Sequence, residues 1–112
     1  MNSHYDVYGI GNAIIDIEFQ VADGFLERFG LRKGVTTLVS PEFQRELLPH
    51  LEEHEPHIEA GGSVANTLSG IALLGGTALF KGKVGRDNNG SLYKTRMAAA
   101  GVDIDLIQVD GP

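Results

Sequence analysis

Residues 59–76 read EAGGSVANTLSGIALLGG, with two adjacent glycines at the start of a helical pattern. Apolar residues recur at helical spacing between residues 63 and 74, which predicts a helix there. Gly61 and Gly62 carry no Cβ atom, so a ligand can lie against their backbone N–H groups. Partial positive charge also collects where a helix begins. This stretch therefore predicts a binding turn in front of a helix.

On both sides of this stretch, strand-like apolar runs alternate with helical patterns, as in a βαβ succession with a parallel sheet. Asp23 is expected to cap one helix and Gly30 to end it in the left-handed conformation. Because the last residues continue a strand pattern, we expect an incomplete chain whose sheet has an open edge. Strands are expected at residues 5–11, 13–21, 34–40, 77–85 and 102–109, and helices at 23–30, 41–51, 63–74 and 88–101.

The composition is that of one globular domain or part of one, with 112 residues, 42% hydrophobic and 21% charged. The lack of cysteine excludes a disulfide framework, a thiolate metal site and a cysteine nucleophile, and favours a reducing cytoplasm. A formal net charge of -6 disfavours binding to nucleic acid phosphates. The first residues lack the pattern of a signal peptide, and no run reaches the length of a membrane span. We expect a cytoplasmic protein with no nucleic acid or membrane partner.

Two nucleotide-binding motifs share glycines with this sequence. Gly9 and Gly11 follow a strand, but a dinucleotide-binding turn needs a third glycine, which the next segment lacks. A Walker A loop needs Ser or Thr directly after its Gly-Lys pair, and Gly82-Lys83 is followed by Val84. The sequence therefore disfavours NAD binding and excludes a P-loop.

Two polar residues near the N-terminus carry a different pattern. Asn12 and Asp16 are four residues apart, so in an extended chain they share a face. A carboxylate there can accept two hydrogen bonds from a vicinal diol, each about 1.5–3 kcal/mol, although Asp16 can equally be a solvated strand residue. Asn66 can bind a ligand through its amide or hydrogen-bond its own backbone. Together, Asn12, Asp16, Gly61, Gly62 and Asn66 predict a site for a polyhydroxylated ligand.

Three further groups have both a functional and a structural interpretation. Three histidines between residues 50 and 57 have helical spacing suited to a metal ion. The segment that contains them is polar and bracketed by prolines, which favours a solvated helix end. The phenylalanines can stack on a nucleobase or pack in a core. The cations can attract phosphate or face solvent. These groups are His50, His54 and His57; Phe19, Phe25 and Phe29; and Lys81, Lys83 and Arg86.

Three segments, GIGNAIIDIE, AGGSVANTLSGIALLGG and GKVGRDNNG, follow one another in an order and spacing that resemble the ribokinase or PfkB family of carbohydrate and nucleoside kinases. The chain is similar to the N-terminal part of that family over essentially all of its residues, and its GGS-x-x-N form looks more like the adenosine kinase branch. The resemblance implies an α/β fold, a ribokinase-like three-layer α/β/α core (incomplete here) with a small β-sheet lid. Lid strands are expected from about 14–21, 35–39 and 103–109 in a single domain whose C-terminal ATP-binding part is absent.

By the same resemblance, the five residues of the predicted site match substrate positions, with Asp16 and Asn66 holding sugar hydroxyls. A further match, VG-x-D-x-x-G over residues 84–90, is expected to shape a turn and cap the next helix. The family's catalytic base lies in a D-T-x-G-A-G-D stretch, and an N-x-x-E segment helps place magnesium. Neither occurs here, so we expect no catalytic residue and no metal ligand in these 112 residues, and no activity of this chain alone.

The function implied for the parent protein is ATP-dependent phosphorylation of a sugar hydroxyl, with a ribonucleoside such as adenosine as the first candidate. Ribose or fructose is the alternative substrate, and a non-catalytic nucleoside- or sugar-binding module is the alternative class. The resemblance implies ATP and Mg2+ as cofactors, with K+ as a further candidate. It also suggests a homodimer formed through the lid.

Overall fold

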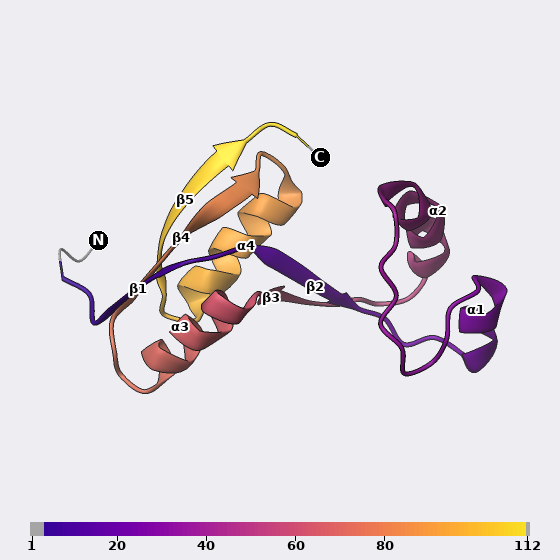
Figure 1. Ribbon diagram of the computed structural model, residues 1–112, viewed down its shortest axis with the longest axis horizontal. Helices are drawn as coiled ribbons and strands as arrows, with labels where there is room; N and C mark the ends of the chain where they lie inside the picture. The colour runs from indigo at the N-terminus through magenta and orange to yellow at the C-terminus, as the bar shows by residue number, and fades with distance from the viewer. Residues whose placement is uncertain (1–3, 112) are drawn as a thin grey trace. The chain divides into compact units, whose positions relative to one another are not determined.

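The computed structural model describes residues 4–111. The chain divides into two compact units, Met1–Asp16 with Ile58–Pro112, and Ile17–His57. We call the first the sheet unit and the second the helical unit (Figure 1).

The sheet unit is built from a parallel sheet and two helices. Its strands β1 (Val7–Ile10), β4 (Ala78–Gly85) and β5 (Asp103–Val109) lie in the order β1-β4-β5 and pair in parallel. The helix α3 (Ser63–Leu73) precedes β4, and α4 (Asn88–Ala99) connects β4 to β5. The parallel sheet predicted from the alternation of strands and helices is therefore confirmed.

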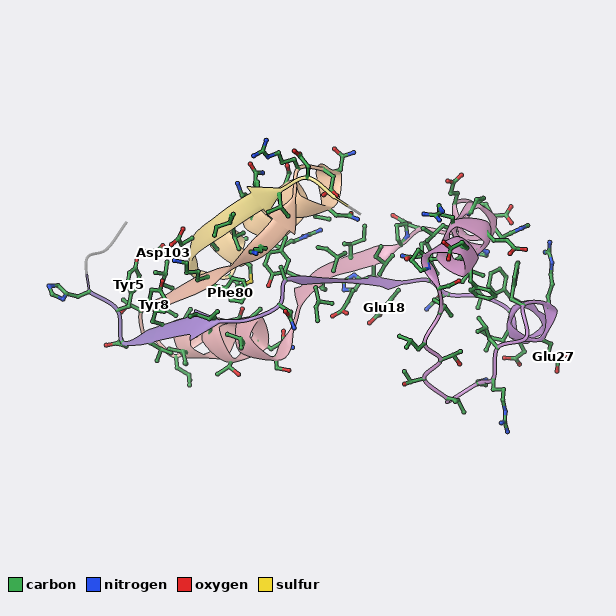
Figure 2. The ribbon with its side chains drawn as sticks, turned by 45° about the horizontal axis from the view of Figure 1, so that its top comes forward. Tyr5, Tyr8, Glu18, Glu27, Phe80 and Asp103 are labelled. Carbon is green, nitrogen blue, oxygen red and sulfur yellow. The ribbon has the colours of Figure 1, made fainter. Side chains whose placement is uncertain are left out.

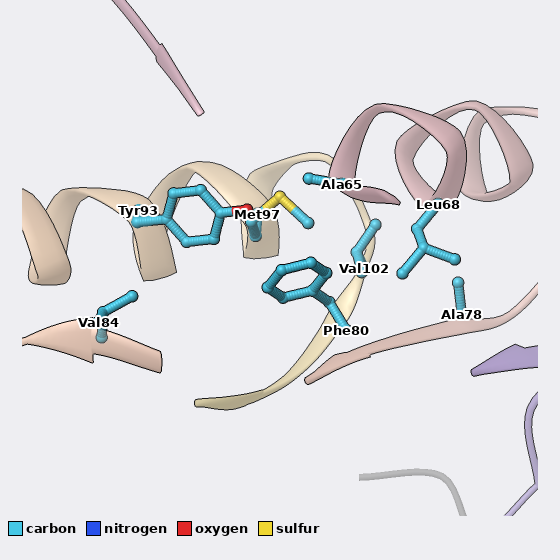
Figure 3. Close-up of a cluster of buried hydrophobic side chains, with 8 residues drawn as sticks. All are labelled: Ala65, Leu68, Ala78, Phe80, Val84, Tyr93, Met97 and Val102. Carbon is cyan, nitrogen blue, oxygen red and sulfur yellow. The ribbon is translucent and has the colours of Figure 1, made fainter. Parts of the chain in front are cut away.

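One hydrophobic core lies between this sheet and its helices (Figure 3). Phe80 of β4 and Tyr93 of α4 are its largest fully buried side chains, with ring centroids 5.8 Å apart. Leu68 of α3 and Met97 of α4 pack into the same cluster. Because burying one large apolar side chain stabilises a fold by about 1.5–3 kcal/mol, this cluster holds both helices against the sheet.

Polar contacts join the amino ends of the three strands. The Thr77 N–H donates to Asp6 Oδ2 at 2.9 Å, and the Asp6 N–H donates to Thr77 Oγ1 at 3.0 Å. The Tyr5 hydroxyl donates to Asp103 Oδ2 at 2.8 Å, and both residues are labelled in Figure 2. These contacts fix the positions at which the strands begin. Because the strands are parallel, all three then end at the opposite edge of the sheet.

The helical unit contains two short helices, α1 (Asp23–Arg28) and α2 (Pro41–Leu51). The Phe29 ring, just after α1, lies 5.1 Å from the ring of His50 in α2. Ser40 Oγ accepts a hydrogen bond at 3.1 Å from the backbone N–H three residues on. The predicted start of α2 at Ser40-Pro41 is therefore confirmed.

A second sheet has two strands, β2 (Ile14–Glu18) and β3 (His57–Gly61). β2 falls within the strand expected at residues 13–21, whereas no strand is expected from the sequence at the residues of β3. Ile58 and Ala60 are half-buried and alternate with the exposed His57 and Glu59, which is the pattern of a half-buried strand. β3 leads directly into the two glycines.

The structure differs from three sequence-based expectations. Residues 35–39, expected as a lid strand, have no regular secondary structure, because β-branched composition alone does not supply a hydrogen-bonded partner. Residues 103–109 form a strand, but it pairs with β4 over its whole length and so belongs to the parallel sheet rather than to a lid. Asp23 is the first residue of α1 and not its cap, and its Oδ1 pairs with Lys33 Nζ at 3.2 Å.

Candidate functional site

The two glycines form the junction between β3 and α3. Gly61 is the last residue of β3, and Gly62 is the N-cap of α3. Gly62 has a φ of 106°, which residues with a side chain rarely adopt. The first helical hydrogen bond runs from the Asn66 N–H to the Gly62 carbonyl at 2.9 Å. The N–H groups of the first turn are therefore directed at the junction, where they can meet an acceptor.

Each glycine leaves room for one of the two polar residues predicted near the N-terminus. A Cβ atom on Gly61 would overlap the carboxylate of Asp16, which supplies the three nearest atoms. A Cβ atom on Gly62 would lie 2.6 Å from the backbone oxygen of Asn12. The structure thus brings Asp16 next to Gly61 and Asn12 next to Gly62, although 45 and 50 positions separate the members of these pairs along the chain.

Asn66 lies in the first turn of α3, and it is exposed. The nearest atoms to the Cβ positions of Gly61 and Gly62 come from Asp16, Asn12 and Ile14, and none comes from Asn66. Its place one turn into the helix agrees with the sequence analysis. Its proposed contact with a ligand hydroxyl stays a prediction.

Tyr93 is a residue of this region that sequence reasoning missed. Its side chain is 0% exposed, and its hydroxyl donates to the carbonyl oxygen of Gly61 at 3.2 Å. Burial raises the pKa of the Tyr93 phenol, because ionisation would place a charge away from water. The signal available in the sequence was helical spacing with Met97, four residues on, which places both on one buried face. A buried tyrosine hydroxyl then needs a hydrogen-bond partner.

The turn before α4 matches the role expected for residues 84–90. Asp87 is the N-cap of α4, and its Oδ1 accepts a hydrogen bond from the Gly90 N–H at 2.8 Å. A Cβ atom on Gly90 would overlap the carbonyl oxygen of Gly85. Both glycines and the aspartate are therefore used for turn geometry and capping.

A pocket of about 420 Å³ lies at the carboxyl ends of β1 and β4. Ligands of open parallel sheets bind outside the carboxyl ends of the strands. Asn12 and Lys83 line this pocket together with Ile10, Gly11, Ala13, Lys81, Gly82 and Ile107. One of the predicted site residues is therefore at a concave surface of the expected kind.

The cations and histidines are now placed as well. Lys81 Nζ lies 3.6 Å from Asp105 Oδ2, and Arg86 Nε lies 3.9 Å from Asp110 Oδ1. In residues 4–111 there is no group of three or more histidine, aspartate or glutamate side chains that could hold a metal ion. The three histidines do not share one helix end: His50 lies in α2, His54 follows that helix, and His57 is the first residue of β3.

Comparison with known proteins gives the family. Residues 37–111, more than half of the chain, match the family model described as pfkB family carbohydrate kinase. The chain belongs to the pfkB family. The matched segment includes Gly61, Gly62 and Asn66, whereas Asn12 and Asp16 precede it. The resemblance drawn from the sequence is confirmed.

Relatives in the pfkB family include nucleoside and sugar kinases. The chain is 33% identical over 70 residues to guanosine-inosine kinase of Escherichia coli, covering 61% of this chain. It is 46% identical over 50 residues to a fructokinase of Escherichia coli, covering 45% of this chain. It spans only 16% of the length of each.

A solved structure to which the chain is similar is the adenosine kinase from Sinorhizobium meliloti. It is 39% identical, with a TM-score of 0.73, over 96% of this chain and 32% of that chain. The expected fold class, α/β of the ribokinase-like type with a parallel sheet, is therefore confirmed for the part of the fold that this chain forms. Among the described residues, no helix is both long enough and apolar enough to span a membrane.

Proposed function

We propose that the complete protein is an ATP-dependent kinase that phosphorylates a sugar hydroxyl of a ribonucleoside, adenosine first. The observation that supports this most is the 39% identity with the Sinorhizobium meliloti adenosine kinase across 96% of the chain. The similarity to guanosine-inosine kinase supports the nucleoside class independently. This chain supplies the substrate-binding side of the enzyme.

Asp16 is the acceptor for the sugar diol in this proposal. Its carboxylate lies against the backbone at Gly61, where a bound sugar can reach both the carboxylate and the first turn of α3. Hydrogen bonds to a charged acceptor are worth about 1.5–3 kcal/mol each, so a ligand that lacks one hydroxyl binds much more weakly. Asn66 adds an amide that donates to one hydroxyl oxygen and accepts from another.

Asn12 has a different role in the proposed site, to which both its backbone and its side chain contribute. Its backbone oxygen is held against Gly62, so the link between β1 and β2 is fixed beside the turn. Its position also lines the pocket at the carboxyl ends of the strands. We assign it to substrate binding at the mouth of that pocket.

In the same proposal the catalytic base lies outside this chain, ATP and Mg2+ are bound mainly by residues outside it, and K+ is a further candidate. Phosphoryl transfer relies on positioning and on stabilising negative charge, and neither the base nor a phosphate cradle is identified here. We therefore expect the 112-residue chain alone to be inactive.

A free sugar kinase is the second candidate. It is supported by the 46% identity with a fructokinase, although over only 50 residues. Both candidates use the same diol-binding residues, because fructose and ribose also present vicinal hydroxyls. The two candidates differ in whether the nucleobase of a nucleoside substrate occupies the rest of the site.

The cytoplasmic location and the homodimer formed through the lid stay predictions. The location is supported by the lack of cysteine, since a reducing compartment does not favour disulfides. The lid itself is proposed for the segment around residues 14–21, where β2 pairs with β3.

The test is an assay of the complete protein with ATP and adenosine, inosine, guanosine, ribose or fructose. Turnover of a nucleoside supports the first candidate, and turnover of only ribose or fructose supports the second. Binding of any of them without turnover favours a non-catalytic binding module and contradicts both kinase proposals. The 112-residue chain is assayed in parallel, and turnover by it would contradict the placement of the base outside this chain.

A further inference from the structure

We propose that Tyr93 is a positioning residue for the substrate-binding turn, acting through the Gly61–Gly62 peptide. This inference rests on the proposed function, because it assigns the turn to a bound sugar or nucleoside. Tyr93 itself is buried in the core, and it acts through that peptide rather than through a contact of its own with a ligand.

The contact is one that the fold holds firmly. The Tyr93 side chain is 0% exposed, and its ring packs 5.8 Å from that of Phe80. Its hydroxyl donates to the Gly61 carbonyl oxygen at 3.2 Å, from α4 to the end of β3. A buried hydroxyl that loses its partner is costly, so this hydrogen bond is kept whenever the core is formed.

Fixing the Gly61 carbonyl also fixes the Gly62 N–H. The peptide between them is planar and trans, so its carbonyl and its N–H point in opposite directions. With the carbonyl directed at Tyr93 in the core, the Gly62 N–H points away from the core. Gly62 is the N-cap of α3, so this backbone donor lies at the junction between β3 and α3.

Two glycines in succession make this orientation easy to lose. Rotation of the peptide plane by half a turn changes only the dihedral angles on either side of it, and both residues lack a Cβ atom. Such a rotation would move the φ of Gly62 from 106° to the negative range that every residue adopts. The Tyr93 hydrogen bond opposes that rotation and keeps the donor in place before substrate arrives.

The test is Tyr93→Phe in the complete protein, which keeps the ring and removes only the hydroxyl. The matched control is Tyr5→Phe, which also removes a hydroxyl that donates a hydrogen bond, here to Asp103. We measure adenosine affinity by calorimetry, the KM values for adenosine and ATP, the thermal midpoint, and the amide resonance of Gly62. We expect Tyr93→Phe to weaken adenosine binding by roughly fivefold to tenfold, as loss of one hydrogen bond does.

Several outcomes separate positioning from a merely structural role. Weaker adenosine binding in Tyr93→Phe with an unchanged KM for ATP, a shifted Gly62 resonance and no such effect in Tyr5→Phe supports the proposal. Unchanged adenosine affinity, with only a lower thermal midpoint, overturns it. If the unmutated protein binds none of the five compounds, the proposed function fails. In that case the Gly62 resonance alone gives the answer: a shift in Tyr93→Phe supports positioning, and no shift overturns it.

Discussion

The carboxylate of Asp16 occupies the space that a Cβ atom on Gly61 would need. This relationship joins a strand near the N-terminus to the turn before α3. It means that the acceptor proposed for the sugar is held in place only because residue 61 has no side chain. A side chain at residue 61 would therefore change the position of the Asp16 carboxylate.

Gly61→Ala is expected to displace the Asp16 carboxylate. The clashing atoms are the end of an exposed side chain that can turn away, so we expect little change in the free energy of unfolding. We expect the KM for nucleoside to rise by about tenfold or more, because the charged acceptor is moved from its place. Urea unfolding and steady-state kinetics on the complete protein measure the two effects. Gly70→Ala in α3 is the matched control, because a Cβ atom there meets nothing within 4 Å. That control is expected to be more stable by about 0.5–1 kcal/mol, and equal losses in both variants would contradict the role of Asp16.

Asp16→Asn keeps the shape of the side chain and removes its charge. We expect nucleoside binding to weaken by roughly tenfold to a hundredfold, because the diol loses a charged acceptor. Binding of ATP should change much less, since Asp16 is assigned to the sugar alone. Calorimetric titration with each ligand tests this, and equal losses for nucleoside and ATP would count against the assignment.

Asp87→Ala removes the cap of α4, where Asp87 Oδ1 accepts from the Gly90 N–H at 2.8 Å. We expect the free energy of unfolding to fall by about 1 kcal/mol while nucleoside affinity stays the same. Asp87→Asn retains a capping oxygen and should lose much less. If Asp87→Ala lost more free energy of nucleoside binding than free energy of unfolding, Asp87 would have a role in binding.

The buried phenol of Tyr93 predicts a loss of stability in alkali. Its pKa is raised in the folded state by burial, so the unfolded chain loses the proton first, near its ordinary value of about 10. The contribution of the protonated Tyr93 phenol to the free energy of unfolding is fully present below about pH 10. It is lost as the pH rises above that value, by at most about 1.4 kcal/mol per pH unit. Urea unfolding between pH 8 and pH 11 measures the slope. Tyr93→Phe should show a shallower fall, and an identical slope would refute the prediction.

The arrangement of the sheet unit and the start of α2 in the helical unit were largely predictable from the sequence. Strand and helix alternation gave parallel pairing, and the Ser40-Pro41 and Asp87 signals located two helix starts. These features depend on local chemistry, namely hydrophobic period and capping side chains. Local chemistry is present in the sequence before any tertiary contact forms.

The errors concern features that depend on partners. Residues 35–39 have strand composition but no strand structure, and β5 alternates as a lid strand would, yet it pairs with β4. Pairing is a property of two segments, so neither composition nor alternation identifies the neighbour. Tyr93 was missed for the same reason, because its partner is a backbone oxygen 32 positions away. The sequence predicts Asp16, Gly61 and Gly62 as parts of one site, but the packing of the Asp16 carboxylate against Gly61 is a tertiary contact that no local pattern contains.

The fit between residues 16 and 61 also limits how descendants of this sequence can drift. Gly61 is not among the glycines with a positive φ, and the three atoms nearest to a Cβ position there all belong to Asp16, so alanine at residue 61 and the present position of that carboxylate exclude each other. A lineage that shortened residue 16 would free position 61 to acquire a side chain. Once it had done so, restoring the aspartate would meet an occupied space. Loss of the sugar acceptor would then be hard to reverse, although neither replacement alone need unfold the protein.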